Sequence, residues 1–331
     1  MWPMQPTKPA AYPEIFSSFQ MGHLTLKNRI VVPPMLQLRP ITSPEGIGWY
    51  RRLAAGGAAW VTVEVTSVWR FGKDLTVATL KPLVDAMHRE GVGVGIQIFP
   101  VEFGADQDPN ALSAERIDET FEAYAYAAGI CQGAGFDAVE PHGAHGYLIN
   151  QFFMPDRNRR TDQYGGTLAN RCRFAQRIVQ RIRKAVGGAY LIFYRHTPTG
   201  PAYGIDDSLE MAKALVEAGV NVLDISPAKR DVEADLAHPF KRFGVPVIAV
   251  NGMEDLNAAS RAVREGRCDL VAIGRSLIAD AQLPRKIQMG RESEVLSCLK
   301  CDAGCFGHLR KRELVYCAAW QKDEVAAFVA Q

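Results

Sequence analysis

Four cysteines near the end of the chain have a spacing that could bind a metal ion or an iron–sulfur cluster. Cys298, Cys301, Cys305 and Cys317 follow the pattern C-x2-C-x3-C-x11-C, and they are four of the seven cysteines in 331 residues. Thiolates at such spacings can converge on one centre, as Zn²⁺ and [4Fe–4S] clusters require. Free thiols are the alternative, which the clustering disfavours. We therefore predict a ligand set, and the spacing leaves zinc and iron–sulfur open.

A second group of reactive side chains lies in the segment Glu140-Pro-His-Gly-Ala-His-Gly-Tyr147. His142 and His145 are three residues apart on a turning segment, so both could donate hydrogen bonds to one substrate oxygen. A tyrosine phenol is protonated at neutral pH, so Tyr147 is suited to donating a proton. We predict that His142, His145 and Tyr147 are catalytic, whereas the alternative is that the histidines are structural.

Two apolar runs in the last third of the chain end in glycine. One leads into Asn251 and Gly252, and the other leads into Gly274 and Arg275. Backbone N–H groups in such loops, together with a guanidinium, form the phosphate site that many barrels place after their last two strands. Glycine as a plain turn residue is the alternative. The two runs together favour a phosphate site.

Arg195 and Gln97 each end a strand-like segment. Arg195 follows four apolar residues, so we expect it to be nearly buried, where an unpaired charge is costly. A reduced flavin, which is negative at N1 and the C2 carbonyl, would supply the anionic partner, and the Gln97 amide could bind the same pyrimidine edge. A salt bridge from Arg195 to Glu64 or Asp224 is the alternative.

The polar residues named so far cluster at the ends of short β-branched runs. Most of these runs follow an amphipathic segment, such as 208–218 or 256–265, which ends at Gly219 or Gly266 as a helix C-cap would. Eight such units predict a (β/α)8 TIM barrel, whose strands bring their C-terminal ends to one mouth. A doubly wound sheet is the alternative. The expected strands are 30–32, 60–65, 92–99, 138–141, 191–194, 222–225, 247–250 and 270–273.

Composition excludes several classes of function. The net charge is +2 and basic and acidic residues alternate along the chain, so we expect no nucleic-acid surface. There is no apolar run long enough to span a membrane, and residues 1–10 do not resemble a signal peptide, so we expect a cytoplasmic protein. The run Gly91-Val-Gly-Val-Gly95 lacks the spacing of a dinucleotide-binding loop. The expected partners are small molecules or proteins, and a homo-oligomer remains open.

Several motifs together resemble the old yellow enzyme family of FMN-dependent ene reductases, and the resemblance covers nearly the whole chain from about Pro13. They include His142-x-x-His145-Gly-Tyr147, Arg160-x-Asp162-x-Tyr164-Gly-Gly166 and Ile273-Gly-Arg275. The resemblance implies that flavin N5 passes hydride to the β-carbon of an activated alkene, the histidines polarise the carbonyl, and Tyr147 protonates the α-carbon. It also implies FMN contacts from Pro34, Met35, Val65, Gln97, Arg195, Gly252, Gly274 and Arg275, next to Asn251.

The cysteine run is similar to the [4Fe–4S] segment in the branch that contains 2,4-dienoyl-CoA reductase and trimethylamine dehydrogenase. Those relatives carry a further FAD and nicotinamide module, whereas this sequence stops 14 residues after Cys317. We therefore expect electrons to reach FMN through the cluster from a separate reductase or electron-transfer protein, or directly from NAD(P)H. The expected domains are a flexible tail (1–12), an FMN-binding barrel (13–290) and a cluster-binding segment packed on the barrel (291–331).

The leading expectation is thus an FMN-dependent ene reductase acting on an α,β-unsaturated carbonyl or thioester. An amine or alcohol dehydrogenase that exports electrons through the cluster is a second hypothesis, for which Trp49, Trp69 and Phe71 could form an aromatic cage around a cationic amine. A third hypothesis is a non-redox phosphate-binding barrel with a structural zinc site.

Overall fold

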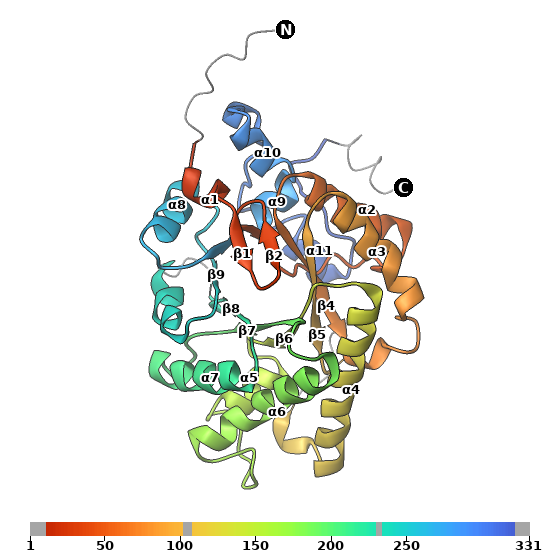
Figure 1. Cartoon of the computed structure of the whole chain (residues 1–331), viewed down its shortest axis with the longest axis vertical. Coiled ribbons are helices and arrows are strands. Elements are labelled where there is room, and N and C mark those ends of the chain that lie inside the picture. Colours follow the sequence, from red (N-terminus) through yellow and green to blue (C-terminus); the bar gives the residue numbers. More distant parts are fainter. Residues whose placement is uncertain (1–10, 102–107, 230–233, 322–331) are drawn as a thin grey trace.

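Eight parallel strands form a closed barrel, which confirms the predicted (β/α)8 fold (Figure 1). The computed structural model describes residues 11–101, 108–229 and 234–321, so most of the expected tail and the last ten residues lie outside the described part. The strand order around the barrel is β10-β3-β4-β5-β6-β7-β8-β9. The strands are β3 (Ile30–Val32), β4 (Trp60–Ser67), β5 (Gly93–Phe99), β6 (Ala138–Gly143), β7 (Leu191–His196), β8 (Val222–Ile225), β9 (Val247–Val250) and β10 (Leu270–Ala272).

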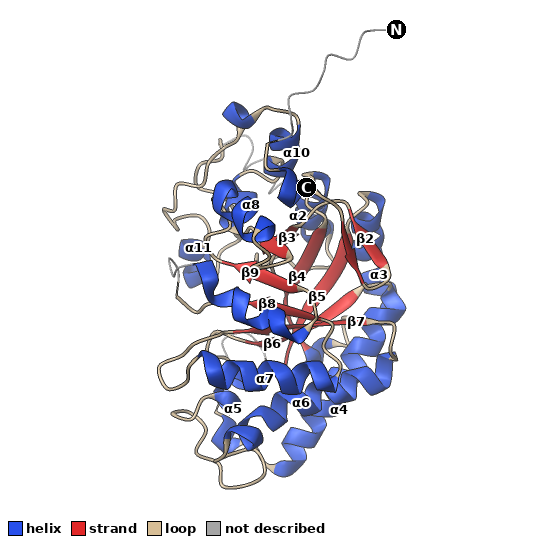
Figure 2. Ribbon diagram, turned by 60° about the vertical axis from the view of Figure 1, so that its left-hand side comes forward, coloured by secondary structure: helices blue, strands red, loops and turns tan. Residues whose placement is uncertain are grey.

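Helices surround the strands on the outside of the barrel (Figure 2). The longer ones, except α7, begin at side-chain caps, because Ser, Thr and Asp oxygens accept hydrogen bonds from the free backbone N–H groups of the first turn. They are α2 (Pro44–Ala55), α3 (Val77–Arg89), α4 (Ala114–Ala134), α6 (Leu168–Val186), α7 (Ile205–Ala218) and α8 (Leu256–Arg264). Shorter helices are α1 (Pro13–Phe16), α5 (Leu148–Phe153), α9 (Arg275–Ala279), α10 (Leu283–Gln288) and α11 (Phe306–Lys311).

Three strands run further than the sequence predicts, and the first of them, β4, continues to Ser67. β6 and β7 continue to Gly143 and His196 because His142 pairs in register with Arg195 and Gly143 pairs with His196. The ladder of backbone hydrogen bonds therefore includes residues whose side chains are polar. This extension fixes the positions of His142 and Arg195 on neighbouring strands.

The N-terminal end of the barrel is closed by a hairpin of β1 (Phe19–Met21) and β2 (Leu24–Leu26). Beneath it the Trp60 indole stacks on Phe193, with ring centroids 4.8 Å apart. A Cβ atom at Gly93 would lie 2.6 Å from the Trp60 ring, and one at Gly95 would lie 2.9 Å from it. The glycine-rich run in β5 thus makes room for an indole.

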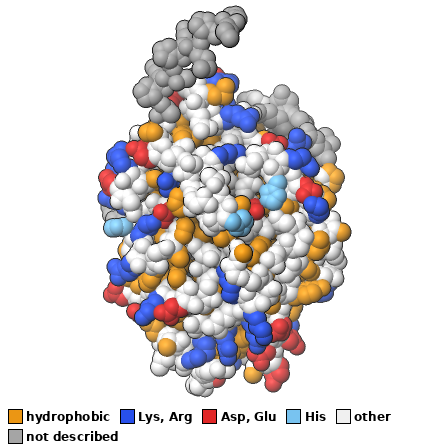
Figure 3. Space-filling view, viewed as in Figure 1, with side chains coloured by type: hydrophobic (Ala, Val, Ile, Leu, Met, Phe, Trp, Pro, Cys, Tyr) orange, Lys and Arg blue, Asp and Glu red, His pale blue; other side chains and the backbone are white. Residues whose placement is uncertain are grey.

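The surface carries both signs of charge. In the face shown in Figure 3, Lys and Arg side chains lie among Asp and Glu side chains, and neither sign covers a large area. In the part of the chain that the structure describes, no helix is both long enough and apolar enough to cross a membrane.

The cysteine-containing segment packs against the barrel through a few specific contacts. Arg39 Nη1 donates to the Val315 carbonyl at 2.9 Å, and Val315 N donates to the Gln37 carbonyl at 3.2 Å. Trp320 Nε1 donates to the Ala279 carbonyl at 2.8 Å, while the Arg52 guanidinium lies 4.1 Å from the centre of the Trp320 ring. The loop after β3 therefore contacts both the barrel mouth and the cysteine segment.

Candidate active site at the barrel mouth

The structure brings His142, His145 and Tyr147 together where β6 ends. The ring centroids of His142 and His145 are 5.3 Å apart, and those of His142 and Tyr147 are 5.1 Å apart. Phe99, the last residue of β5, contacts Tyr147 edge to face at 5.3 Å and forms an apolar wall. Three groups that can donate a proton or hydrogen bond thus surround one small region of the mouth.

Backbone conformation and a hydroxyl pair hold His145 in place. Its φ of 61° lies in the left-handed region, and its backbone N–H donates to Thr197 Oγ1 at 2.9 Å. Its Nε2 lies 2.9 Å from Oγ of Ser226, which follows β8. These contacts orient the ring toward the residues of β7 and β8.

Both histidines are neutral at physiological pH. Burial, followed by His145 and the positive charge of Arg195, holds the pKa of His142 well below its ordinary value. Burial and the charge of Arg195 lower the pKa of His145 to about 3, although a contact with the Ser226 backbone opposes them. Each imidazole can therefore donate one hydrogen bond, and neither is suited to acting as a cationic acid.

Arg195 is buried on β7, and its guanidinium has an N–H group without an acceptor among the described residues. It forms an ion pair with Asp224 at 3.4 Å, and Nη2 donates to Ser226 Oγ at 3.0 Å. Nε and Nη1 are buried and make no hydrogen bond with the described residues. The ion pair predicted as an alternative is therefore present, between Nη1 and Asp224, and Nε stays available to a ligand.

Gln97 and Glu140 form a buried pair beside Arg195. Gln97 Nε2 donates to Glu140 Oε1 at 2.7 Å, so the amide nitrogen is occupied by the protein. Burial, and then the nearby Asp224, raise the pKa of Glu140 to about 8, while Arg195 opposes this shift. Burial also raises the pKa of Asp224, again opposed by Arg195. The pairing of Gln97 with Glu140 could not be predicted from the sequence, because the two residues are 43 positions apart.

Glu64, near the C-terminal end of β4, binds the loop after β3 instead of Arg195. Its Oε2 accepts from the backbone N–H of Gln37 at 2.8 Å and from Tyr50 Oη at 3.1 Å. Burial raises the pKa of Glu64 to about 7, although these hydrogen bonds oppose the shift. Glu64 therefore joins β4 to the same loop that contacts the cysteine segment.

The remaining predicted FMN residues lie at the C-terminal ends of strands. Asn251 and Gly252 have left-handed φ values of 79° and 76°, and a Cβ atom at Gly274 would lie 3.3 Å from the Met35 sulfur. Arg275 forms an ion pair with Asp302 at 3.0 Å, so its guanidinium also faces the cysteine segment. The set placed at this end of the barrel is Pro34, Met35, Val65, Gln97, Arg195, Asn251, Gly252, Gly274 and Arg275.

The four cysteines of the C-terminal segment line a single cavity, together with Arg275 and Asp302. Cys301 is exposed, and the other three are partly buried. In the described ranges, no three His, Cys, Asp or Glu side chains are arranged closely enough to hold a metal ion. Soft thiols around one cavity nevertheless fit a thiolate-bound centre. The other cysteines, Cys131, Cys172 and Cys268, are buried.

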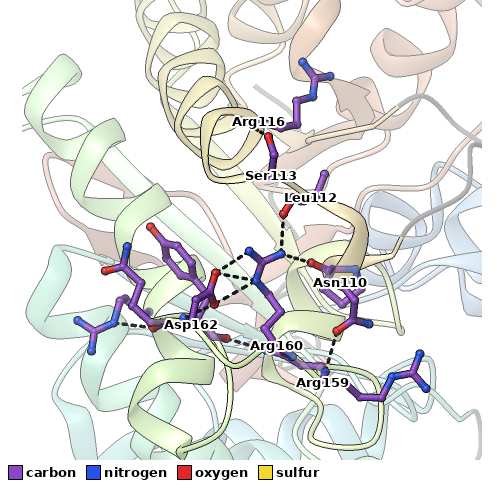
Figure 4. Close-up of polar contacts among 12 residues, drawn as sticks. Asn110, Leu112, Ser113, Arg116, Arg159, Arg160 and Asp162 are labelled. Carbon is purple, nitrogen blue, oxygen red and sulfur yellow. Dashed lines mark hydrogen bonds and ion pairs between the residues drawn. The ribbon is translucent and has the colours of Figure 1, made fainter.

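The motif Arg160-x-Asp162-x-Tyr164-Gly-Gly166 supports two loops at the mouth (Figure 4). Arg160 binds Asp162 at 2.6 Å and donates to the carbonyl groups of Pro109 and Leu112, each at 2.7 Å. Asn110 accepts a hydrogen bond from Arg159 N at 2.7 Å. The motif thus joins the loop before α6 to the loop before α4.

Trp69 and Phe71, two of the three aromatic residues considered as an amine cage, line one cavity, and Trp49 is not among the residues that line it. Trp49 is buried against Trp320, with ring centroids 6.3 Å apart. Trp69 instead donates from its indole to the Pro100 carbonyl and is covered by the Arg116 guanidinium at 3.9 Å. Trp49 therefore belongs to the contact between the barrel and the cysteine segment.

Comparison with known proteins identifies relatives along most of the chain. The model of the NADH:flavin oxidoreductase / NADH oxidase family matches residues 102–294. The chain is 32% identical to an NADH oxidase of Thermoanaerobacter brockii, over 89% of this chain and 54% of that protein. It is 30% identical to an NADPH dehydrogenase of Halalkalibacterium halodurans, over 82% of this chain and 93% of that protein.

Among solved structures, the fold is similar to that of a 2-naphthoyl-CoA reductase in complex with 2-naphthoyl-CoA. The TM-score is 0.84 at 26% identity, over 93% of this chain and 57% of that one. The chain spans about half the length of the first curated relatives that it matches. Sequence motifs, closed barrel and family model agree, and the chain belongs to the NADH:flavin oxidoreductase / NADH oxidase family, the old yellow enzyme family.

Proposed function

We propose that this flavin oxidoreductase is an ene reductase that acts on an α,β-unsaturated carbonyl or thioester. The observation that carries the proposal is the convergence of His142, His145 and Tyr147 at the mouth, next to the buried Arg195. Neutral imidazoles and a phenol suit a substrate that presents an oxygen atom and accepts a proton. Membership of a flavin family contradicts the hypothesis of a non-redox barrel.

The buried polar groups of the mouth fit FMN. Arg195 Nε and Nη1 lack hydrogen-bond acceptors among the described residues, and the Gln97 carbonyl oxygen is left over once its amide nitrogen binds Glu140. We infer that Arg195 and Gln97 hold the pyrimidine edge, and that the loops at Asn251 and Gly274 hold the phosphate. When bound, FMN supplies the hydride for the reduction.

The side chains of the protein have separate tasks in this reaction. His142 and His145 bind and polarise the substrate carbonyl, because two hydrogen bonds to one oxygen favour the electron-rich form of the substrate. Tyr147 donates the proton to the α-carbon. Phe99 packs against Tyr147 and His142, and this packing limits the space through which water reaches the two rings.

We further propose that Cys298, Cys301, Cys305 and Cys317 bind a [4Fe–4S] cluster. The support is that all four line one cavity beside Arg275, at the boundary between barrel and segment. In this proposal residues 13–290 form the FMN domain and residues 291–331 the cluster segment. A separate reductase or electron-transfer protein would supply electrons through the cluster, or NAD(P)H would supply them at the mouth.

The test is to purify the protein anaerobically, photoreduce its flavin and add one candidate oxidant at a time. We expect a cyclic enone, a cinnamate or an enoyl thioester to reoxidise the flavin faster than an untreated control. If none of these alkenes reoxidises it, the ene-reductase proposal is wrong. Flavin reduction by amines in the same apparatus would instead support the dehydrogenase hypothesis.

A further inference from the structure

We propose that Ser226 is a positioning residue that fixes His145 in its Nδ1–H tautomer and thereby makes Nδ1–H the group that the ring offers to the substrate carbonyl. The assignment of the tautomer rests on contacts within the protein. Only the second half, the contact with substrate, rests on the proposed function.

The direction of the hydrogen bond follows from Arg195. A guanidinium can only donate, so the 3.0 Å contact from Arg195 Nη2 makes Ser226 Oγ an acceptor there. The hydroxyl hydrogen of Ser226 then needs an acceptor of its own. In the part of the chain that the structure describes, the only other partner of this hydroxyl is His145 Nε2, at 2.9 Å.

The opposite tautomer would leave a polar group unsatisfied. If His145 carried its hydrogen on Nε2, both Arg195 and His145 would donate to Ser226 Oγ, and the hydroxyl hydrogen would have no acceptor. Ser226 is 2% exposed, so water does not readily replace that acceptor. A buried donor without a partner costs about 1–3 kcal/mol, which favours the Nδ1–H tautomer.

The other ring nitrogen of His145 is the one available to a ligand. Nδ1 is not among the buried polar atoms of the described residues that lack a partner, so these residues do not enclose it. The neighbouring His142 differs, because its Nδ1 is buried and unpaired, which leaves Nε2 as its outward atom. The two rings can therefore offer one N–H each to the same oxygen.

A second histidine–serine pair in the barrel has the opposite direction and provides an internal control. His196 Nε2 also lies 2.9 Å from a serine hydroxyl, that of Ser208. Here the hydroxyl hydrogen is already used, because Ser208 Oγ donates to the Pro198 carbonyl at 2.8 Å. His196 must therefore donate from Nε2, and its Nδ1 is buried without a partner. The same bond length thus predicts opposite tautomers for His145 and His196.

The experiment is ¹⁵N–¹H NMR of the whole protein labelled at its histidines, with His145 and His196 assigned by the loss of a signal in His145→Gln and His196→Gln. We expect Nδ1 to carry the hydrogen in His145 and Nε2 to carry it in His196. An Nε2–H signal from His145 in the wild-type protein would overturn the proposal. This measurement requires no substrate.

Matched variants distinguish a specific effect of Ser226 on the His145 tautomer from a general disturbance of the fold. Ser226→Ala should abolish the preference of His145 for Nδ1–H and leave His196 unchanged, whereas Ser208→Ala should leave His145 unchanged. Ser226→Thr retains the hydroxyl and should restore the Nδ1–H signal. If His145 has the same spectrum in folded Ser226→Ala as in the wild type, Ser226 does not set the tautomer.

The contact with substrate is tested with 2-cyclohexenone as the probe. Loss of one oriented hydrogen bond predicts that kcat/KM falls about fivefold to tenfold in Ser226→Ala, mainly through KM, with recovery in Ser226→Thr. An unchanged kcat/KM would overturn the role in substrate binding. If the wild-type protein reduces no alkene, the proposed function fails together with that role, while the NMR result still decides the tautomer.

Discussion

The barrel mouth and the cysteine segment both carry reactive side chains, yet the protein holds them in different ways. At the mouth, His142, Arg195 and Asp224 lie on the adjacent strands β6, β7 and β8 and are all buried. In the segment, the cysteines lie in loops around the short helix α11, and Cys301 is exposed. A barrel fixes side chains before a ligand arrives, whereas a loop of thiols gains most of its order from the ligand that it binds.

The largest expected effect is the loss of bound iron from the cysteine segment. Cys301→Ser should remove most of the bound iron, because a thiolate ligand is lost from a site with only four. The flavin content should stay near the wild-type value, since the residues proposed to bind FMN lie on the barrel. Iron and flavin are measured per mole of purified protein.

Cys268→Ser is the matched control, because Cys268 is buried in the barrel core and does not line the cysteine cavity. It should retain its iron. Equal iron content in the Cys301 and Cys268 variants would contradict the cluster assignment and remove the contrast between the two regions.

The next largest expected effect is on the rate of alkene reduction at the barrel mouth. Tyr147→Phe removes the proposed proton donor and keeps the ring that packs on Phe99 and His142. We expect alkene reduction to slow by about 10²–10⁴-fold, the usual contribution of a general acid. Stopped-flow reoxidation of the reduced flavin measures this step. Photoreduction of the variant should proceed as in the wild type, and equal reoxidation rates would show that another group donates the proton.

The third prediction concerns Glu64, which joins β4 to the loop that contacts the cysteine segment. It is tested by the pH dependence of the unfolding free energy. The pKa of Glu64 is about 7 in the folded protein, compared with an ordinary value of 4.5. A raised pKa in the folded state means that the folded protein holds this proton more tightly. Its contribution to stability is therefore present below pH 4.5 and is lost as the pH rises to about 7.

In Glu64→Gln, an amide oxygen can still accept from Gln37 and Tyr50, but it does not titrate. Between pH 4.5 and pH 8, the wild type should lose about 3 kcal/mol of unfolding free energy relative to this variant. Urea unfolding at the two pH values measures the difference. Glu119→Gln, at an exposed carboxylate on α4, is the control and should follow the wild type; parallel behaviour of Glu64→Gln would show that Glu64 has an ordinary pKa.

The smallest effect concerns how the segment is anchored. Trp320→Phe removes the hydrogen bond to the Ala279 carbonyl and leaves an aromatic ring for Arg52, so it should cost about 1 kcal/mol. Hydrogen exchange should become faster in residues 313–321 and remain unchanged in the barrel. Trp69→Phe, which loses an indole hydrogen bond to Pro100 at the mouth, should give the reverse pattern.

The repeating pattern of the sequence predicted the barrel well. The expected strands 30–32, 222–225 and 247–250 agree with β3, β8 and β9, because apolar runs between helical segments are a local signal. α7 begins at Ile205 instead of residue 208, since the Asp207 carboxylate accepts from Gly204 N and adds a turn. Such caps depend on side-chain conformations that a hydrophobic pattern does not record.

The partners within the site could not be predicted from the sequence. Motif spacing brought His142, His145 and Tyr147 together because they lie in one short segment. The bonds from Ser226 to His145 and from Arg39 to Val315 join residues that are 81 and 276 positions apart, and only the closed barrel sets such distances. Arg275 was predicted to bind phosphate, and its ion pair with Asp302 likewise required the folded segment.

The bond between Arg39 and Val315 also has a consequence for how the protein is made. Synthesis on the ribosome proceeds from the N-terminus, so the loop after β3 must wait for almost the whole chain before its partner emerges. β10 pairs with β3, so the barrel is closed by strands that all precede the four cysteines in the sequence. We therefore expect the eight strands to pair before the bond between Arg39 and Val315 forms, because Val315 leaves the ribosome after every strand of the barrel.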